Sequence, residues 1–146
     1  MAKGYPDFFG FSMFPWYGGI IRSAFATTCP ADTVTPIHAI VSKGSIVGGY
    51  LQLTGVADIT DILIYAWVDG QLITTLRYGG TLVTTTPGVP TDWFYLDVVS
   101  YERELMCAHI QPGISFQDTW TISVDNRSLA DSCVGNSIVF YQRVAT

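Results

Sequence analysis

The chain has few charged residues, and positive charge is especially sparse. Charged residues make up 13% of the 146 residues, against about 25% in an average soluble domain. Seven Lys and Arg residues stand against twelve Asp and Glu residues, so the formal net charge at pH 7 is −5. The basic residues are scattered rather than clustered, which argues against a nucleic-acid partner. No continuous apolar run reaches the about 18 residues of a membrane-spanning helix, so we expect no membrane span.

Cysteine is also rare. The three cysteines, Cys29, Cys107 and Cys133, are far apart and form no Cys-x-x-Cys pair. Metal cages and disulfide scaffolds normally show an even number of cysteines or closely spaced ones. Because unpaired cysteines are often buried, we expect all three to be small apolar residues in or near the core.

The residues that catalysis requires are scarce as well. The chain has two histidines, His38 and His109, and no Gly-x-Ser-x-Gly motif accompanies them. Cys107 precedes His109 by two residues, and on a strand such side chains are about 6–7 Å apart, too far for a direct hydrogen bond. Glu102 and Glu104 lie in a charge-rich segment that is typical of a solvent-facing turn. We therefore expect no enzyme, no metal and no cofactor.

The sequence is instead rich in apolar and β-branched residues. Apolar residues make up 49% of the chain and aromatic residues 14%, which excludes a disordered chain. Helical periodicity is almost absent, whereas in 119–125 Trp120, Ile122 and Val124 alternate with polar residues, as on a half-buried strand. Strands are predicted at 20–27, 37–42, 46–54, 62–68, 71–78, 93–101, 103–110, 119–125 and 137–144. We expect a single all-β domain, a jelly-roll-like or Greek-key β-sandwich of about eight to ten antiparallel strands.

One hairpin can be predicted at the level of its register. Asp69-Gly70 favours a type I′ turn, which would pair Val68 with Gln71. The same register places Trp67 opposite Leu72, Tyr65 opposite Thr74, and Leu63 opposite Leu76. Gly79-Gly80 is a candidate for a second turn. Both faces of the hairpin are largely apolar, so we expect one face in the core and the other covered by an arm, a loop or a neighbouring subunit.

The first 19 residues differ in composition from the rest. Their aromatic residues are Tyr5, Phe8, Phe9, Phe11, Phe14, Trp16 and Tyr17. Interspersed glycines and prolines oppose a helix or a central strand. Since burial of one aromatic side chain contributes about 2–3 kcal/mol, we expect these residues to dock on a protein surface. We predict an extended aromatic N-terminal arm (1–19) on a β-sandwich domain (20–146), with the arm packing on its own sandwich or on a neighbouring chain.

These features favour an architectural function. We expect a structural, self-assembling protein, such as a small capsid, decoration or cement protein of a virion, whose aromatic arm residues bind the partner. The partners would be further copies of the chain, in two-fold or three-fold symmetry and so including a trimer, and other proteins of the particle. The chain broadly resembles small sandwich proteins of phage particles, without a motif of any one family. The start of the chain lacks the pattern of a secretory signal, so we expect synthesis in the cytoplasm and localisation in a virion.

The alternative is a carbohydrate- or receptor-binding β-sandwich module. Segment 84–91 is rich in Thr, Pro and Gly and predicts an exposed loop. Trp93 and Tyr95 follow this loop and are the candidate ligand-binding residues, because an exposed aromatic ring can stack on a sugar. Under this alternative the partner is a glycan and the protein is a monomer.

Overall fold

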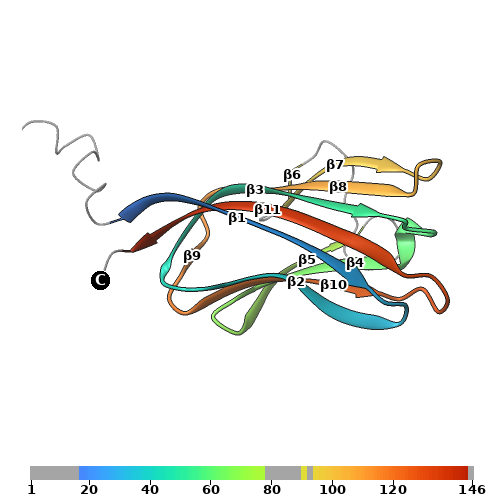
Figure 1. Ribbon diagram of the computed structural model, residues 1–146, viewed down its shortest axis with the longest axis horizontal. Helices are drawn as coiled ribbons and strands as arrows, with labels where there is room; N and C mark the ends of the chain where they lie inside the picture. The colour runs from blue at the N-terminus through green and yellow to red at the C-terminus, as the bar shows by residue number, and fades with distance from the viewer. Residues whose placement is uncertain (1–16, 78–89, 92–93, 145–146) are drawn as a thin grey trace, which may run out of the picture.

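The fold is a two-layered antiparallel β-sandwich, which confirms the predicted all-β class (Figure 1). The computed structural model describes residues 17–77, 90–91 and 94–144. In these residues the strands are β1 (Tyr17–Cys29), β2 (Thr33–Val41), β3 (Gly44–Thr54), β4 (Ile62–Val68), β5 (Gln71–Arg77), β6 (Pro90–Thr91), β7 (Phe94–Ser100), β8 (Leu105–Ile110), β9 (Ser115–Phe116), β10 (Thr119–Asn126) and β11 (Cys133–Val144). A 3-10 turn, Ile59–Asp61, precedes β4 and is capped by the Asp58 side chain.

The strands divide into a large sheet and a small sheet. Within the described residues the large sheet has the order β1-β11-β3-β8-β7-β6, with β9 paired to β3, and the small sheet has the order β2-β10-β4-β5. The first strand of the chain therefore pairs with the last one. Figure 1 shows β1 and β11 running side by side along the length of the molecule, above β2 and β10 of the small sheet.

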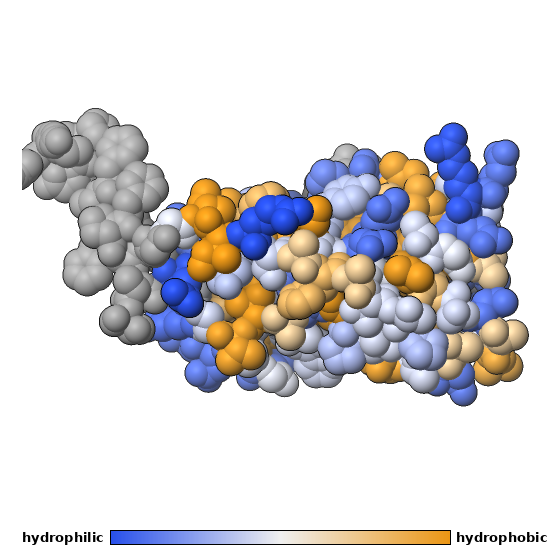
Figure 2. Space-filling model, in the orientation of Figure 1, coloured by the Kyte–Doolittle hydropathy of each residue, from blue (hydrophilic) through white to orange (hydrophobic). Residues whose placement is uncertain are grey.

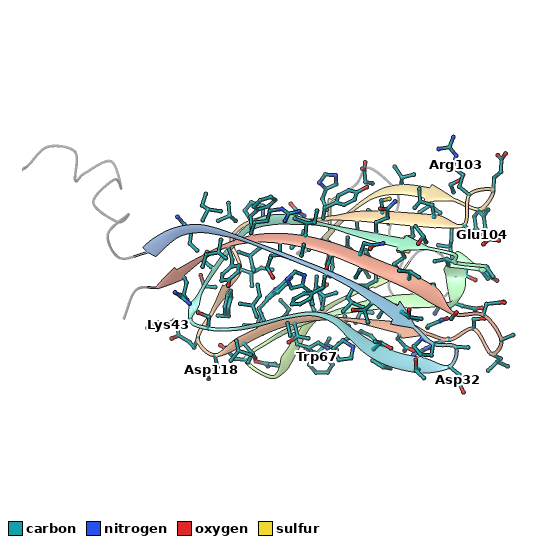
Figure 3. All side chains as sticks on the ribbon, viewed as in Figure 1. Asp32, Lys43, Trp67, Arg103, Glu104 and Asp118 are labelled. Atoms are coloured by element: carbon teal, nitrogen blue, oxygen red, sulfur yellow. The ribbon has the colours of Figure 1, made fainter. Side chains whose placement is uncertain are left out.

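The core lies between the two sheets and is almost entirely apolar. Trp120, Ile122 and Val124 on β10 are fully buried, as their alternation with polar residues predicts. They pack with Leu51 and Leu53 of β3 in one hydrophobic cluster. The charged side chains that Figure 3 labels lie at the two ends of the sandwich, in or beside the turns: Asp32, Lys43, Arg103, Glu104 and Asp118. The long faces of the sheets are left with few charges.

The predicted hairpin forms, but part of its predicted register is wrong. Val68 pairs with Gln71 and Trp67 with Leu72, as expected for the Asp69-Gly70 turn. A β-bulge between Ala66 and Trp67 then shifts the pairing by one residue, so that Tyr65 faces Thr75 instead of Thr74, and Leu63 faces Arg77 instead of Leu76. Because one extra residue reverses the side on which later side chains lie, Leu76 joins Ile64 on the core face.

The strand boundaries agree broadly with the sequence pattern. β1 starts at Tyr17 and so includes the last three residues of the range predicted for the arm. The two-residue strands β6 and β9 were not expected from the pattern, and β6 lies at the end of the predicted 84–91 loop. The Gly79-Gly80 turn and the rest of that loop lie outside the described residues.

Candidate interaction surface

The outer face of the large sheet is mainly apolar over β1 and β11. Residues that face the small sheet occupy odd positions of β1, since Ser23 and Phe25 contact His38 of β2. The even positions therefore point outward, and the strand register places them beside outward residues of β11. We call this set the β1–β11 surface: Ile20, Arg22, Ala24, Ala26, Thr28, Val134, Asn136, Ile138, Phe140 and Gln142. Its apolar members include Ile20, 61% exposed, and Phe140, 39% exposed. Arg22 is its one charged member.

In Figure 2, orange and pale orange atoms lie among blue and white ones in the part of the molecule where Figure 1 draws β1 and β11. The surface extends across the sheet, because Ala24 pairs with Ile138, Ile138 with Tyr50, and Tyr50 with His109. An apolar area on an exposed sheet face commonly marks a site of association with another protein.

The edge of the large sheet at β1 is long and unprotected. Within the described residues β1 pairs with β11 alone, so its opposite side carries unpaired backbone groups. The strand has 13 residues, no proline and a single charged side chain, Arg22. Its irregularity, between Tyr17 and Ile20, is confined to its start. Such an edge is a template for pairing with a further strand.

The other described edges differ from β1. β2 carries Pro36, which cannot donate a backbone hydrogen bond, and the β2–β10 register shifts beside it. β6 has only two residues. β5 has seven residues and ends in Arg77, whose guanidinium donates to the carbonyl of Thr60 at 3.0 and 3.2 Å. Among the described strands, β1 therefore has the edge most suited to association.

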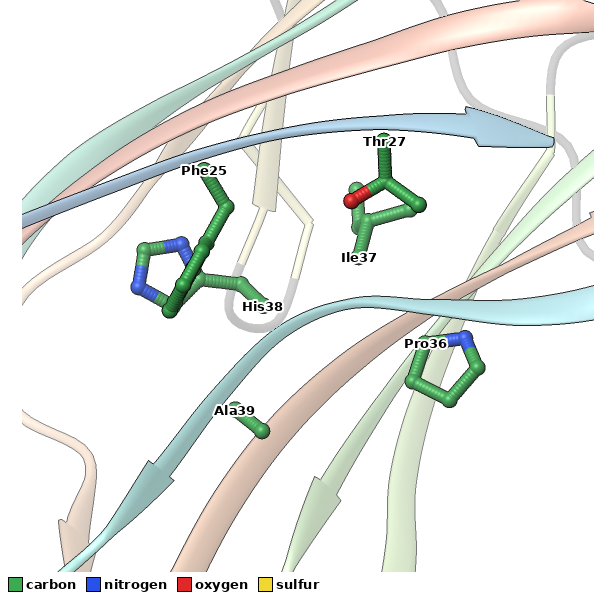
Figure 4. Close-up of a pocket in the computed structure, with 6 residues that line it drawn as sticks. All are labelled: Phe25, Thr27, Pro36, Ile37, His38 and Ala39. Carbon is green, nitrogen blue, oxygen red and sulfur yellow. The ribbon is translucent and has the colours of Figure 1, made fainter.

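A small hollow of about 190 Å³ lies beside this edge, between β1 and β2. Figure 4 shows its lining, with the Phe25 ring descending from β1 against the His38 ring of β2. The two ring centroids are 4.6 Å apart in an edge-to-face arrangement. Phe25 is 47% exposed although it points inward, because it stands at the opening between the sheets. The hollow is apolar and open, with no charged side chain among its described lining residues.

His38 is the most buried ionisable side chain near the hollow. Its Nδ1 lies 2.6 Å from Oγ of Ser137 on β11, and its Nε2 lies 3.0 Å from Oγ of Ser23 on β1. Burial lowers the pKa of His38 to about 4, because the charged imidazolium would lose its hydration. A neutral imidazole can donate through one nitrogen and accept through the other, so the two serines satisfy both. The arrangement joins the two sheets and holds His38 neutral.

The second histidine lies on the outer face of the large sheet. His109 Nε2 is 3.3 Å from Asp97 Oδ2, and its ring contacts Tyr50 at a centroid distance of 5.2 Å. A hydrogen bond with the buried Cys107 thiol, together with desolvation and nearby acidic groups, raises the pKa of Tyr50 to about 12. Cys107 thus contacts Tyr50 while His109 contacts Asp97. These contacts link side chains of β3, β7 and β8 across the large sheet.

Most sequence-predicted site residues lie outside the described part of the chain. This holds for the arm residues Tyr5, Phe8, Phe9, Phe11, Phe14 and Trp16, and for Trp93. The backbone of Tyr17 starts β1 and that of Tyr95 belongs to β7, whereas the side chains of both are outside the described residues. The aromatic arm and its contacts therefore remain predictions.

Two features escaped the sequence analysis. The register places Cys29 opposite Cys133, and the two serines enclose His38. Neither arrangement has a local signal, because the partners lie in the first, second and last strands of the domain.

No protein-family model matches this chain, and no curated protein shows significant similarity to it. Among the described residues, no three His, Cys, Asp or Glu side chains gather as a metal site. No helix in the described part of the chain is long and apolar enough to cross a membrane.

Proposed function

We propose that this protein is a self-assembling structural protein with a jelly-roll fold, and that it serves as a small capsid, decoration or cement component of a virion. The observation that carries the proposal is the long, nearly uncharged edge strand β1 with the apolar β1–β11 surface beside it. The N-terminal arm fastens each subunit to its neighbours through its aromatic residues.

The order of strand pairing supports the jelly roll. In a jelly roll of eight strands, the pairing is nested, so that the first strand pairs with the eighth and the fourth with the fifth. When the short strands β6 and β9 and the strand β7 are set aside, eight strands remain: β1, β2, β3, β4, β5, β8, β10 and β11. Their pairs are β1–β11, β2–β10, β3–β8 and β4–β5, which is the nested pattern. Jelly rolls occur in capsid proteins, lectins and cupins, so the fold favours but does not select a virion role.

The properties of β1 support association in preference to a monomeric existence. Soluble monomers normally protect a long edge with proline, charge or a bulge, as β2 does with Pro36. β1 has a single charge, and its outward side chains Ala24 and Ala26 are small enough for another chain to approach closely. When the β1 edges of two copies pair, their Arg22 side chains need not face each other. Each Arg22 can lie beside a neutral residue of the other copy, because it is the single charged residue of β1. Backbone hydrogen bonds would supply affinity, and the apolar surface would add to it.

The position of the arm supports a role in the same assembly. The aromatic segment leads directly into β1, which begins at Tyr17. A partner that pairs with β1 therefore lies within reach of the arm. A strap of this kind can cross to a neighbouring subunit while the sandwich provides the rigid body of the shell.

The test is the dependence of molecular mass on concentration for the full chain, measured by light scattering and sedimentation. We expect an oligomer whose dissociation constant rises at least about tenfold in Ala24→Lys, because lysine places like charges within the paired edges. The matched control is Ala57→Lys, which puts the same charge on an exposed loop residue before the 3-10 turn. The arm is tested separately by replacing Phe8, Phe11 and Trp16 with serine.

The outcomes separate the two candidate functions. Loss of assembly in Ala24→Lys or in the arm variant, with Ala57→Lys unaffected, supports the proposal. A full chain that stays monomeric at high concentration contradicts it. If that monomer also binds immobilised glycans through Trp93 and Tyr95, the protein is instead a binding module.

A further inference from the structure

The thiols of Cys29 and Cys133 lie together although they are far apart in the sequence. Cys29 ends β1 and Cys133 begins β11, and the two are directly opposite each other in the antiparallel register. Residues so placed have Cα atoms about 4.5 or 5.5 Å apart, depending on the hydrogen-bonding phase. Both distances fall within the range of about 4.4–6.8 Å that a disulfide spans. The backbone therefore already holds the two residues at bonding distance.

The side chains of the pair are also in contact. Cys29 is fully buried and Cys133 is 3% exposed, and both are free thiols. A hydrogen bond joins the two sulfur groups. This hydrogen bond lowers the pKa of the Cys29 thiol, whereas the same contact and burial raise the pKa of Cys133. Cys29 is thus the one that ionises first and reacts as a nucleophile.

The surroundings of the pair hold it in place and leave a route to it. Asn126 Nδ2 donates to the carbonyl of Cys29 at 3.2 Å and to the carbonyl of Asp131 at 2.9 Å, which fastens the 127–132 loop against the pair. Leu129 in this loop is 85% exposed. The cysteines therefore lie one residue layer below an exposed loop at the end of the sandwich. A small oxidant needs only a local opening of this loop to reach them.

We propose that Cys29 and Cys133 are an oxidation site that forms an intrachain disulfide between the first and last strands. With a peroxide as oxidant, the Cys29 thiolate attacks one peroxide oxygen and becomes a sulfenic acid, with release of one water. The Cys133 sulfur then attacks the Cys29 sulfur, and the S–O bond breaks as a second water leaves. Two thiols and one hydrogen peroxide give one disulfide and two waters. This chemistry is independent of the proposed assembly.

The bond would strengthen the edge strand β1. β1 is an edge strand that β11 alone holds within the described part of the large sheet. A disulfide at its carboxyl end would prevent β1 from separating there. It would also close a loop that contains most of the chain, which restricts the unfolded state strongly.

The test uses the full, folded chain incubated with hydrogen peroxide, then denatured and alkylated. We expect one alkylatable thiol instead of three, and a peptide that links Cys29 to Cys133 in mass spectrometry. The melting temperature should rise by several degrees and return to its original value with dithiothreitol. Cys107→Ser is the matched control and should form the same disulfide, whereas Cys29→Ser and Cys133→Ser should not.

Two results would overturn the inference. One is that three thiols stay alkylatable in the folded wild-type chain after oxidation. The other is that the linked peptide contains Cys107. Because both results come from the wild-type chain, the test does not depend on whether the serine variants fold.

Discussion

Nδ1 of His38 and Oγ of Ser137 lie 2.6 Å apart and join the small sheet to the large one. The imidazole belongs to β2 and the hydroxyl to β11, so the bond crosses a core that is mostly apolar. Ser23 of β1 holds the other ring nitrogen at 3.0 Å. A buried polar group stabilises one arrangement of the two sheets, because sliding either sheet would leave the imidazole without partners.

The stability of the protein should fall as the pH drops below neutrality. The pKa of His38 is about 4 in the folded chain and 6.5 in an unfolded one. The unfolded state therefore takes up a proton at pH values where the folded state cannot, and the stabilisation present above pH 6.5 is lost as the pH falls toward 4. Between about pH 7 and pH 5 we expect the free energy of unfolding to decrease by about 2 kcal/mol.

This pH dependence can be measured by urea denaturation at several pH values in a His109→Gln background, which removes the other histidine. His38→Gln should flatten the profile over the same range. If that variant does not fold, an NMR titration of the His38 ring in the parent chain gives the pKa directly. A ring that titrates near 6.5 would contradict the prediction.

Asp69 should stabilise the turn that faces the start of β10. Its carboxylate accepts backbone N–H groups from Gln117, Asp118 and Thr119, with the shortest bond 2.7 Å from the nitrogen of Asp118. These bonds lower the pKa of Asp69 below 3.8, so its contribution is present above pH 3.8 and is lost as the pH falls through the folded pKa.

Asp69→Asn should therefore lower the melting temperature at pH 7, and the difference from the parent should shrink in strong acid. Glu102→Gln, which removes the same charge from an exposed turn, is the control. Equal melting temperatures for Asp69→Asn and the parent at pH 7 would show that the carboxylate contributes nothing.

Gly49 should not tolerate a side chain, whereas its neighbour Gly48 should. A Cβ on Gly49 would lie 2.7 Å from the carbonyl oxygen of Ile138 and 3.1 Å from Cδ1 of Ile110. On Gly48 the nearest atom is 3.8 Å away, an ordinary contact. We expect Gly49→Ala to cost about 1–3 kcal/mol of unfolding free energy, and Gly48→Ala to be nearly neutral. Equal stability of the two variants, measured by denaturant titration, would refute this difference.

The Tyr65 hydroxyl should contribute through its bond to Asp125. It donates to Oδ2 of Asp125 at 2.7 Å, and Arg127 Nε donates to the same oxygen at 3.0 Å. Tyr65→Phe removes one of two donors from a mostly buried carboxylate, so we expect a loss of about 1.5 kcal/mol. In a double-mutant cycle with Asp125→Asn the two losses should not add. Strict additivity would mean that the pair is not coupled.

The strands could be predicted from the sequence because their signal is local. Trp120, Ile122 and Val124 alternate with polar residues, and Asp69-Gly70 fixes the start of one hairpin. The bulge at Ile73 of β5 could not be predicted, since it depends on how β5 packs against the core rather than on the turn. For the same reason the predicted pairing of Leu63 with Leu76 is wrong, and Leu63 faces Arg77.

The candidate site was predictable only in part. The scarcity of charge in 20–27 is visible in the sequence, whereas the exposure of β1 at a sheet edge depends on the pairing of distant strands. The aromatic arm and the ligand residues Trp93 and Tyr95 remain predictions. Nothing near Cys29, Cys133 or His38 in the sequence indicates their partners.

The sequence by itself determined that the chain is an all-β domain with alternating apolar strands, because side-chain direction along a strand depends only on position. It also determined where the turns fall, since Gly, Pro and Asp act through local backbone preferences. Only the tertiary structure decided which strands are neighbours, and hence which edge is left open, which face is apolar and which cysteines meet. Those outcomes depend on pairing between segments far apart in the chain, and the burial of a shared core selects that pairing.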